Sequence, residues 1–259
     1  MIYLAQMDRL ELALLVFCRV VGVIATGPVF QSQRVPWTVK AGFSVLLAVL
    51  LVPLAGAVPV LQELPSFALA AGREVLVGVS LGFVANLLFA AVNMAGEMAD
   101  LQSGFAFAAL VDPSSEERTS IISQFQMITA WLIFLVSNGH HVLLAGLARS
   151  LALVPVGTAA LAAGMPTGVL GLASGMFVAA LQIGAPVIGS VLVADLALGM
   201  LARTVPQMNL LVIGFPVKMV FAFVILMLSL PCLLAAERSL IPMMDRSLTT
   251  VTAYLAGNG

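Results

Sequence analysis

The feature that most constrains this chain is a set of long stretches without Asp, Glu, Lys or Arg. Five of them occupy most of the sequence, at 41–62, 75–96, 119–148, 150–194 and 219–236. A helix needs about 20 mostly apolar residues to cross a bilayer. Charged residues make up only 9% of the chain, whereas soluble domains have about 25%. The sequence therefore predicts an all-α, polytopic membrane-type protein with six or seven helical segments and no soluble domain large enough to fold alone.

Proline, glycine and polar residues divide these stretches into helices. The first helix is expected at about 10–30, the second at 41–58, and the third from about residue 72 to beyond Gly96. Asp-Pro at 112–113 is typical of an N-cap and a first helical position. Asn-Gly at 138–139 is typical of a left-handed C-cap. A helix is therefore expected between these two dipeptides, and the next one is expected to end before residue 155.

The C-terminal part combines a very long helix with a polar turn. Positions 166–202 predict a helix of 37 residues with Pro186 near its middle. At about 55 Å it exceeds a hydrocarbon core of about 30 Å, so it must kink at Pro186, tilt, or extend out of the bilayer. Because proline in a helix interior costs about 3 kcal/mol, Pro206 and Pro216 are expected to bracket a non-helical turn. A last helix is then expected from Pro216 to about Glu237. The predicted fold therefore consists of long kinked helices and helical hairpins.

The turn places polar side chains between otherwise apolar helices. Irregular backbone at membrane depth is tolerated only where protein covers it or water faces it. We therefore expect a hairpin tip at an aqueous surface or against another subunit. Its residues are Arg203, Pro206, Gln207, Asn209, Pro216 and Lys218.

Small and polar residues recur every three or four positions along the third helix. At about 100° per residue they share about one third of its circumference, and Gly78 and Gly82 permit close contact with another helix. Beyond them, the polar residues either emerge into solvent or line an internal aqueous path or a partner subunit, because a charge at the bilayer centre costs about 2.5–3.5 kcal/mol. These polar residues are Asn86, Asn93, Glu97 and Asp100.

Two further features have both a structural and a functional interpretation. The segment SGFAFAALVDP at 103–113 is either a helix end packed in the core or a loop that obstructs a pore, with Gly104, Phe105 and Phe107 at the gate. Asp195 has no charged residue within seven positions, and a buried carboxyl group needs a donor or a proton. We expect Asp195 to be buried and to make an intersubunit hydrogen bond, with a proton relay as the alternative.

Catalytic and ligand-binding motifs are missing from the sequence. It contains no H-E-x-x-H, no G-x-S-x-G and no phosphate-binding glycine-rich loop with a Lys. His140 and His141 are adjacent, so on a helix they diverge by about 100°, which is poor geometry for one metal. A net charge of −1 excludes electrostatic nucleic-acid binding. We expect a non-enzyme without cofactor, metal or nucleic-acid partner.

Five motifs in order along the chain resemble the FliR/SctT family of type III secretion export-gate proteins. GFPVK within the last motif is similar to the flagellar branch of that family. The motifs are GPVFQSQRVP at 27–36, GxxxGFxANLxFxAVxMAGExxDxQxGF at 78–105, DPSSEERTS at 112–120, NGHHxLLxxLxxSLxxVP at 138–155 and RTVPQMNLLVIGFPVK at 203–218.

The resemblance implies a channel subunit that assembles with FliP and FliQ, beside FlhB and other export apparatus proteins. The channel would be the entrance for unfolded flagellar proteins crossing the inner membrane, in a basal-body core displaced toward the periplasm and in contact with membrane lipid. A single domain over 1–259 would combine a FliP-like part at about 1–165 with a FliQ-like hairpin and tail at about 166–259. The segment around Gly104 would then belong to a plug, and the hairpin tip would lie near the cytoplasmic mouth.

The alternative function is a stand-alone secondary transporter. Asp195, Glu97 and the helix break at Pro186 would form a midplane ion site. Transporters usually have two similar halves with breaks in corresponding positions, and the breaks at Pro186 and 204–216 have no N-terminal counterparts. This asymmetry favours the export channel.

Overall fold

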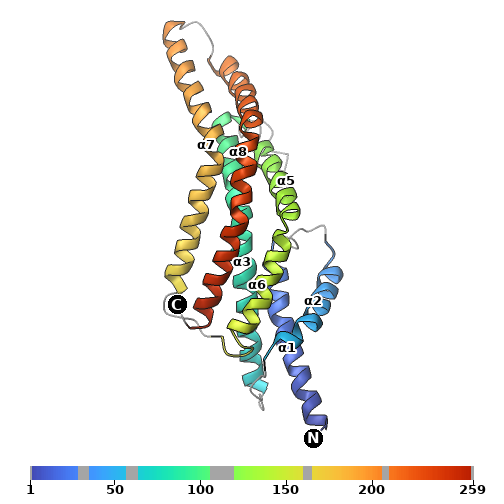
Figure 1. Ribbon diagram of the computed structural model, residues 1–259. Coiled ribbons are helices and arrows are strands. Elements are labelled where there is room, and N and C mark those ends of the chain that lie inside the picture. Colours follow the sequence, from blue (N-terminus) through green and yellow to red (C-terminus); the bar gives the residue numbers. More distant parts are fainter. Residues whose placement is uncertain are drawn as a thin grey trace. The chain divides into compact units, whose positions relative to one another are not determined.

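The computed structural model describes residues 2–28, 35–56, 64–105, 120–159, 165–205 and 210–257. Every regular element in these ranges is helical (Figure 1), which confirms the predicted all-α class. The elements are α1 (Ile2–Thr26), α2 (Trp37–Leu51), the 3₁₀-helix η1 (Val52–Leu54), α3 (Leu64–Ser103), α5 (Ile121–Val136), α6 (Gly139–Leu153), α7 (Met165–Thr204) and α8 (Leu210–Leu255).

The turn between α5 and α6 is the one predicted from Asn138. The backbone of Asn138 is left-handed, with φ of 57°, and the two helices meet there at a bend of 64°. The predicted start of α5 at 112–113 lies outside the described residues. Because the backbone of Ser120 is extended, α5 begins at Ile121.

The last two helices differ from the prediction at their ends. α7 continues through Pro186 as one helix of 40 residues. Pro216 lies inside α8, so the prediction that it bounds the turn is wrong, and α8 extends past Glu237 to Leu255 over 46 residues. A proline removes one backbone hydrogen bond, and a helix of this length keeps many others and packs an apolar face around Leu226.

Fewer helices qualify as membrane spans than the predicted six or seven segments. In the described part of the chain, four are long and apolar enough, and the bent α5–α6 pair adds a fifth if it crosses as one span. α1 contains Arg9, Glu11 and Arg19 and is not among them. The four are Trp37–Leu54, Leu64–Ser103, Thr167–Thr204 and Ile213–Leu255.

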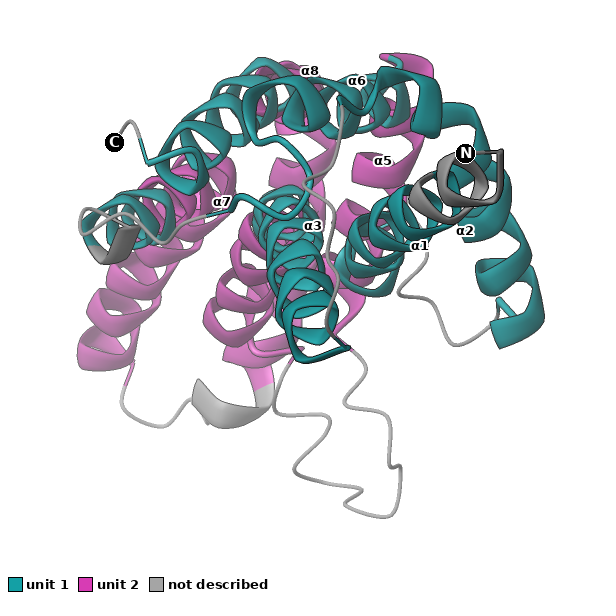
Figure 2. Ribbon diagram, turned by 90° about the horizontal axis from the view of Figure 1, so that it is seen from below, with its two compact units in different colours: residues 1–88, 138–174, 241–259 teal, residues 89–137, 175–240 magenta. Residues whose placement is uncertain are grey.

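Two compact units share the chain and interleave along the sequence (Figure 2). One comprises residues 1–88, 138–174 and 241–259, and the other comprises 89–137 and 175–240. α3, α7 and α8 each contribute to both units. The division into FliP-like and FliQ-like parts near residue 165 follows the family resemblance, and it stays a prediction.

In the first unit, α1 and α3 cross at glycines. A Cβ atom on Gly78 would overlap the carbonyl oxygen of Arg19, and a Cβ on Gly22 would lie 2.7 Å from the carbonyl oxygen of Val75. Gly82 is equally close to Thr26. The close helix contact predicted from Gly78 and Gly82 is therefore confirmed, and α1 is the helix that makes it.

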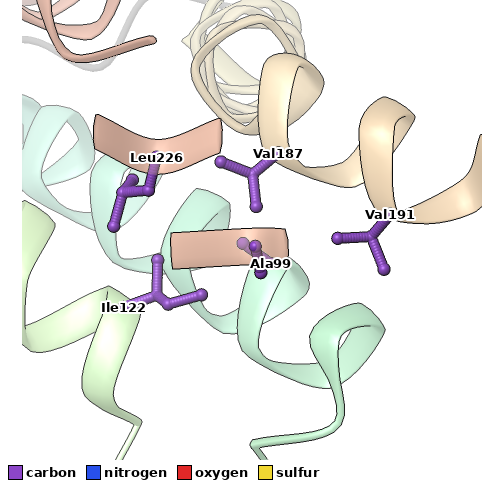
Figure 3. Close-up of a cluster of buried hydrophobic side chains, with 6 residues drawn as sticks. Ala99, Ile122, Val187, Val191 and Leu226 are labelled. Carbon is purple, nitrogen blue, oxygen red and sulfur yellow. The ribbon is translucent and has the colours of Figure 1, made fainter. Parts of the chain in front are cut away.

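In the second unit, four helices contribute to one apolar cluster. Small residues allow this close packing: a Cβ on Gly96 would meet Ser123 of α5, and a Cβ on Gly184 would lie 3.3 Å from the carbonyl oxygen of Ala95. Figure 3 shows the cluster side chains converging from α3, α5, α7 and α8. They are Ala99, Ile122, Val187, Val191, Ala222 and Leu226.

Candidate functional site

The first unit contains a fully buried ion pair. The side chains of Arg19 in α1 and Glu74 in α3 are both 0% exposed. Arg19 Nε donates to Glu74 Oε2 at 2.6 Å and Arg19 Nη2 donates to Oε1 at 3.1 Å. This fork-shaped arrangement is the strongest geometry for a guanidinium and a carboxylate, and in an apolar chain each charge requires the other.

The same guanidinium closes the C-terminal end of α6. Arg19 Nη1 donates to the carbonyl oxygen of Ser150 at 2.8 Å, and Nη2 donates to that of Val154 at 2.9 Å. The backbone N–H of Gly157 donates to Glu74 Oε1 at 2.8 Å. The carbonyl oxygen of Ser150 also accepts the N–H of Val154 at 2.9 Å, so Arg19 adds a second donor there and supplies a donor to Val154 just beyond the helix end, where carbonyl groups often lack one. Through these contacts the ion pair ties α1, α3 and α6 together.

Sequence analysis missed this pair. Arg19 and Glu74 are 55 positions apart, and neither lies in a recognisable motif. The available signal was a basic residue, Arg19, within an apolar stretch of α1 and an acidic residue, Glu74, at the start of an apolar stretch of α3, since intramembrane charges usually occur in pairs.

The polar stripe of α3 does not face a single environment. Glu97 is exposed, Asn86 and Asn93 are half-buried, and Asp100 is 2% exposed. Asn93 Nδ2 donates to Glu97 Oε1 at 2.8 Å. Glu97 is thus the acid of this stripe that remains available to solvent or a partner.

Asp100 caps α5 within the same chain. Its carboxylate accepts hydrogen bonds from the Ser120 hydroxyl and from the backbone N–H groups of Ile122 and Ser123, the latter two at 3.1 Å. The first N–H groups of a helix need such acceptors, and a negative charge there is favourable. Ser123 Oγ also donates to Asn93 Oδ1 at 2.8 Å, so two stripe residues bind α5.

Asp195 is half-buried rather than buried, and its partners come from the same chain. It forms an ion pair with Lys218 of α8, with side-chain exposures of 32% for Asp195 and 23% for Lys218. Gln102 Nε2 of α3 donates to its Oδ2 at 3.2 Å. The expected intersubunit hydrogen bond is therefore not needed to satisfy Asp195, and Lys218 lies within a helix rather than at a tip.

The start of the predicted gate segment rests on α8. Gly104 has a left-handed backbone with φ of 90°, and a Cβ there would meet the ring of Phe215 at 2.6 Å. The ring of Phe105 lies edge-on to Phe223, with centroids 5.1 Å apart. Phe107 lies outside the described residues. Glycine is required at position 104 by both its backbone and its neighbour.

The predicted hairpin tip is only partly described. Arg203 is exposed in the last turn of α7, where a basic residue complements the helix dipole. Pro206, Gln207 and Asn209 lie outside the described residues, and Pro216 and Lys218 belong to α8.

Metal-binding geometry is absent from the described residues, where no three His, Cys, Asp or Glu side chains gather. His140 and His141 do not diverge as expected: their ring centroids are 4.3 Å apart. Both cysteines are free, and Cys232 is exposed on α8.

These observations define a helical membrane protein in which several charged side chains, among them Arg19, Glu74 and Asp100, join its helices. Residues 10–243 match the bacterial export proteins, family 1. The chain belongs to this family of bacterial export proteins, and the resemblance drawn from its motifs is confirmed.

Curated relatives agree over most of their length. The chain is 34% identical to a flagellar biosynthetic protein FliR of Bacillus subtilis over 251 residues, which cover 96% of this chain and 97% of the relative. It is 34% identical to that of Escherichia coli K12 over 204 residues, covering 78% and 77% of the two chains. The FliR of Caulobacter vibrioides is 27% identical over 224 residues, covering 86% and 89%.

Proposed function

We propose that the protein is a core subunit of the flagellar type III export gate, which forms with FliP and FliQ the channel entrance for unfolded flagellar proteins. The observation that carries the proposal is the match to the export family over residues 10–243, together with relatives that are named as flagellar proteins. FlhB and other export apparatus proteins are further partners. The role is one of conduction, and no covalent chemistry is assigned to this chain.

Exposed small residues on α7 support assembly with other helical proteins. A Cβ on Gly189 or Gly199 would have no neighbouring atom within 4 Å, and Val193 and Met200 beside them are exposed. In membranes, helices approach one another closely where such small residues face outward. We assign this face to neighbouring subunits.

The proposed residue roles follow from their positions. Glu97, with Asn86 and Asn93, faces the lumen or a neighbouring subunit, and Arg203 with the residues at 206–209 forms the tip near the cytoplasmic mouth. Gly104 and Phe105 are the hinge of the plug that includes Phe107. Their contacts with Phe215 and Phe223 would hold the base of the plug in place.

The length of the C-terminal helices supports a position partly outside the inner membrane, toward the periplasm, in the flagellar basal body. α7 and α8 have 40 and 46 residues. At 1.5 Å per residue they measure about 60 and 69 Å, about twice the hydrocarbon thickness. The half that extends beyond the bilayer needs protein around it.

Copurification tests the assembly. The tagged chain is expressed with FliP and FliQ and extracted in mild detergent. The variant carries both Gly189→Lys and Gly199→Lys, and the matched control carries Gly171→Lys. A stable complex that the double variant loses and the control keeps supports the proposal. If the chain purifies alone as a stable particle and moves a solute in liposomes, it is a transporter instead. The ion pair between Asp195 and Lys218 already argues against a free ion-binding carboxylate there.

A further inference from the structure

α2 is covered along one side, by buried and half-buried residues, and is exposed along the other. Its buried residues are Ser44 and Ala48, and within the first unit α2 packs on α1. Large aliphatic side chains make up much of the exposed side, and the following are each more than half exposed: Val45, Leu46, Val49, Leu50 and Leu54. A contiguous apolar surface of this kind marks an interaction site.

The part of this surface beyond residue 44 offers no polar side chain to a protein partner. From residue 45 to 54 the sequence is VLLAVLLVPL, which contains no side chain that can donate or accept a hydrogen bond. The hydroxyl of Ser44, one residue earlier, donates to the carbonyl oxygen of Lys40 at 2.7 Å and is satisfied within the helix. Protein-facing membrane helices are enriched in small and hydrogen-bonding residues, whereas the large exposed side chains between residues 45 and 54 are branched aliphatic ones. The exposed Thr38 and Gly42 lie nearer the Trp37 end of the helix.

The N-terminal end of α2 has the residues of a membrane interface. Trp37, 74% exposed, is the first residue of the helix, and Lys40 follows one turn later. Tryptophan is enriched where acyl chains meet headgroups, and lysine extends its ammonium group toward headgroup phosphates while its stem stays among apolar atoms. Both residues lie at the same end of the apolar surface.

The length of the element matches one bilayer. α2 has 15 residues and η1 adds three. At about 1.5 and 2.0 Å per residue they span about 28 Å, close to a hydrocarbon thickness of about 30 Å. α7 and α8 do not share this match.

We propose that the outer surface of α2 binds phospholipid, with its aliphatic face against acyl chains and with Trp37 and Lys40 at the level of the headgroups. This contact persists in the assembled protein. The surface around Leu46 lies at the depth of the bilayer centre, because it is about 14 Å along the helix from Trp37.

Tryptophan quenching by brominated phospholipids tests the proposal. The full-length protein, with every subunit that copurifies, is reconstituted in vesicles whose lipids carry bromine either near the headgroup end or near the methyl end of the acyl chains. Trp131→Phe leaves Trp37 as the single indole of this chain, and Trp37→Phe is the matched control. A second reporter carries Trp37→Phe, Trp131→Phe and Leu46→Trp.

Bromines near the headgroup are expected to remove about half of the Trp37 emission and bromines near the methyl ends much less. The Leu46→Trp reporter is expected to show the reverse depth order. A variant with both Trp37→Phe and Trp131→Phe gives the emission of any other subunit, and this emission is subtracted from each measurement. Equal quenching at both depths, or quenching of Trp37 no greater than that of Trp131 in the control, overturns the proposal and indicates that protein covers α2.

Discussion

Glu74→Gln is expected to destabilise the first unit strongly. The carboxylate accepts three hydrogen bonds, two from Arg19 and one from the N–H of Gly157. Glutamine keeps one acceptor oxygen, turns an NH₂ group toward the donors, and removes the negative charge beside a guanidinium that is 0% exposed. Breaking a buried pair in this way costs about 3–5 kcal/mol.

The assay is thermal unfolding in mild detergent, followed by loss of the monodisperse peak in size-exclusion chromatography. For a chain of this size, 1 kcal/mol corresponds to about 2–4 °C, so we expect a fall in the apparent Tm of about 10 °C. Asp245→Asn is the matched control. It removes the acid of a pair with Arg149 whose side chains are 47% and 41% exposed, and such pairs contribute about 0–1 kcal/mol.

A double-mutant cycle decides whether the charges act as a pair. Arg19→Met combined with Glu74→Leu removes both charges, and replacing a buried pair with apolar residues is often close to neutral. The carbonyl oxygen of Ser150 still accepts from the N–H of Val154 at 2.9 Å. We therefore expect the double variant to be more stable than either single variant. If its loss equals the sum of the two single losses, or if Glu74→Gln behaves like the Asp245 control, the reasoning is refuted.

Three further predictions concern the other contacts. Asp100→Ala removes the cap of α5 and is expected to cost about 1–2 kcal/mol in the same unfolding assay, whereas an unchanged Tm would show that the cap is dispensable. Gly78→Ala forces a methyl group into the carbonyl oxygen of Arg19 and is expected to cost about 1–3 kcal/mol; Gly171→Ala, which has open space, is expected to be neutral or slightly stabilising. Lys218→Glu places two acids together and is expected to abolish secretion of flagellar proteins into culture medium, and Asp195→Lys in the same chain is expected to restore it. Failure of that rescue would mean that Lys218 acts through another partner.

Local signals in the sequence predicted the elements that depend on neighbouring residues. Asn138 gives a left-handed turn because its side chain tolerates positive φ, and the structure has that turn. Gly78 and Gly82 predicted a close helix crossing, which α1 supplies. In each case the residue type itself imposes the local geometry.

Contacts between distant residues could not be predicted in the same way. Asp195 has no charged neighbour along the chain, yet Lys218 pairs with it across α7 and α8. The position of Asp100 on its helix groups it with residues expected to face solvent, an internal aqueous path or a partner subunit, but the start of α5 covers it. Pro216 misled the prediction because a proline disfavours a helix without excluding one when neighbouring helices pack against it.

The polar contacts and the apolar surfaces lead to one physical conclusion. Arg19, Glu74 and Asp100 are satisfied inside the chain, so what is left at the surface of the described helices is largely Leu, Val, Ile, Met and Phe. Lipid can cover such a surface only over about 30 Å of height. α2 with η1 fits within that height, but α7 and α8 are each about 60 Å long or more. Apolar surface beyond the bilayer that faced water would cost about 25 cal/mol of free energy per Å². The parts of α7 and α8 that extend beyond the bilayer therefore need other proteins to cover them, whereas lipid is enough to cover the outer side of α2.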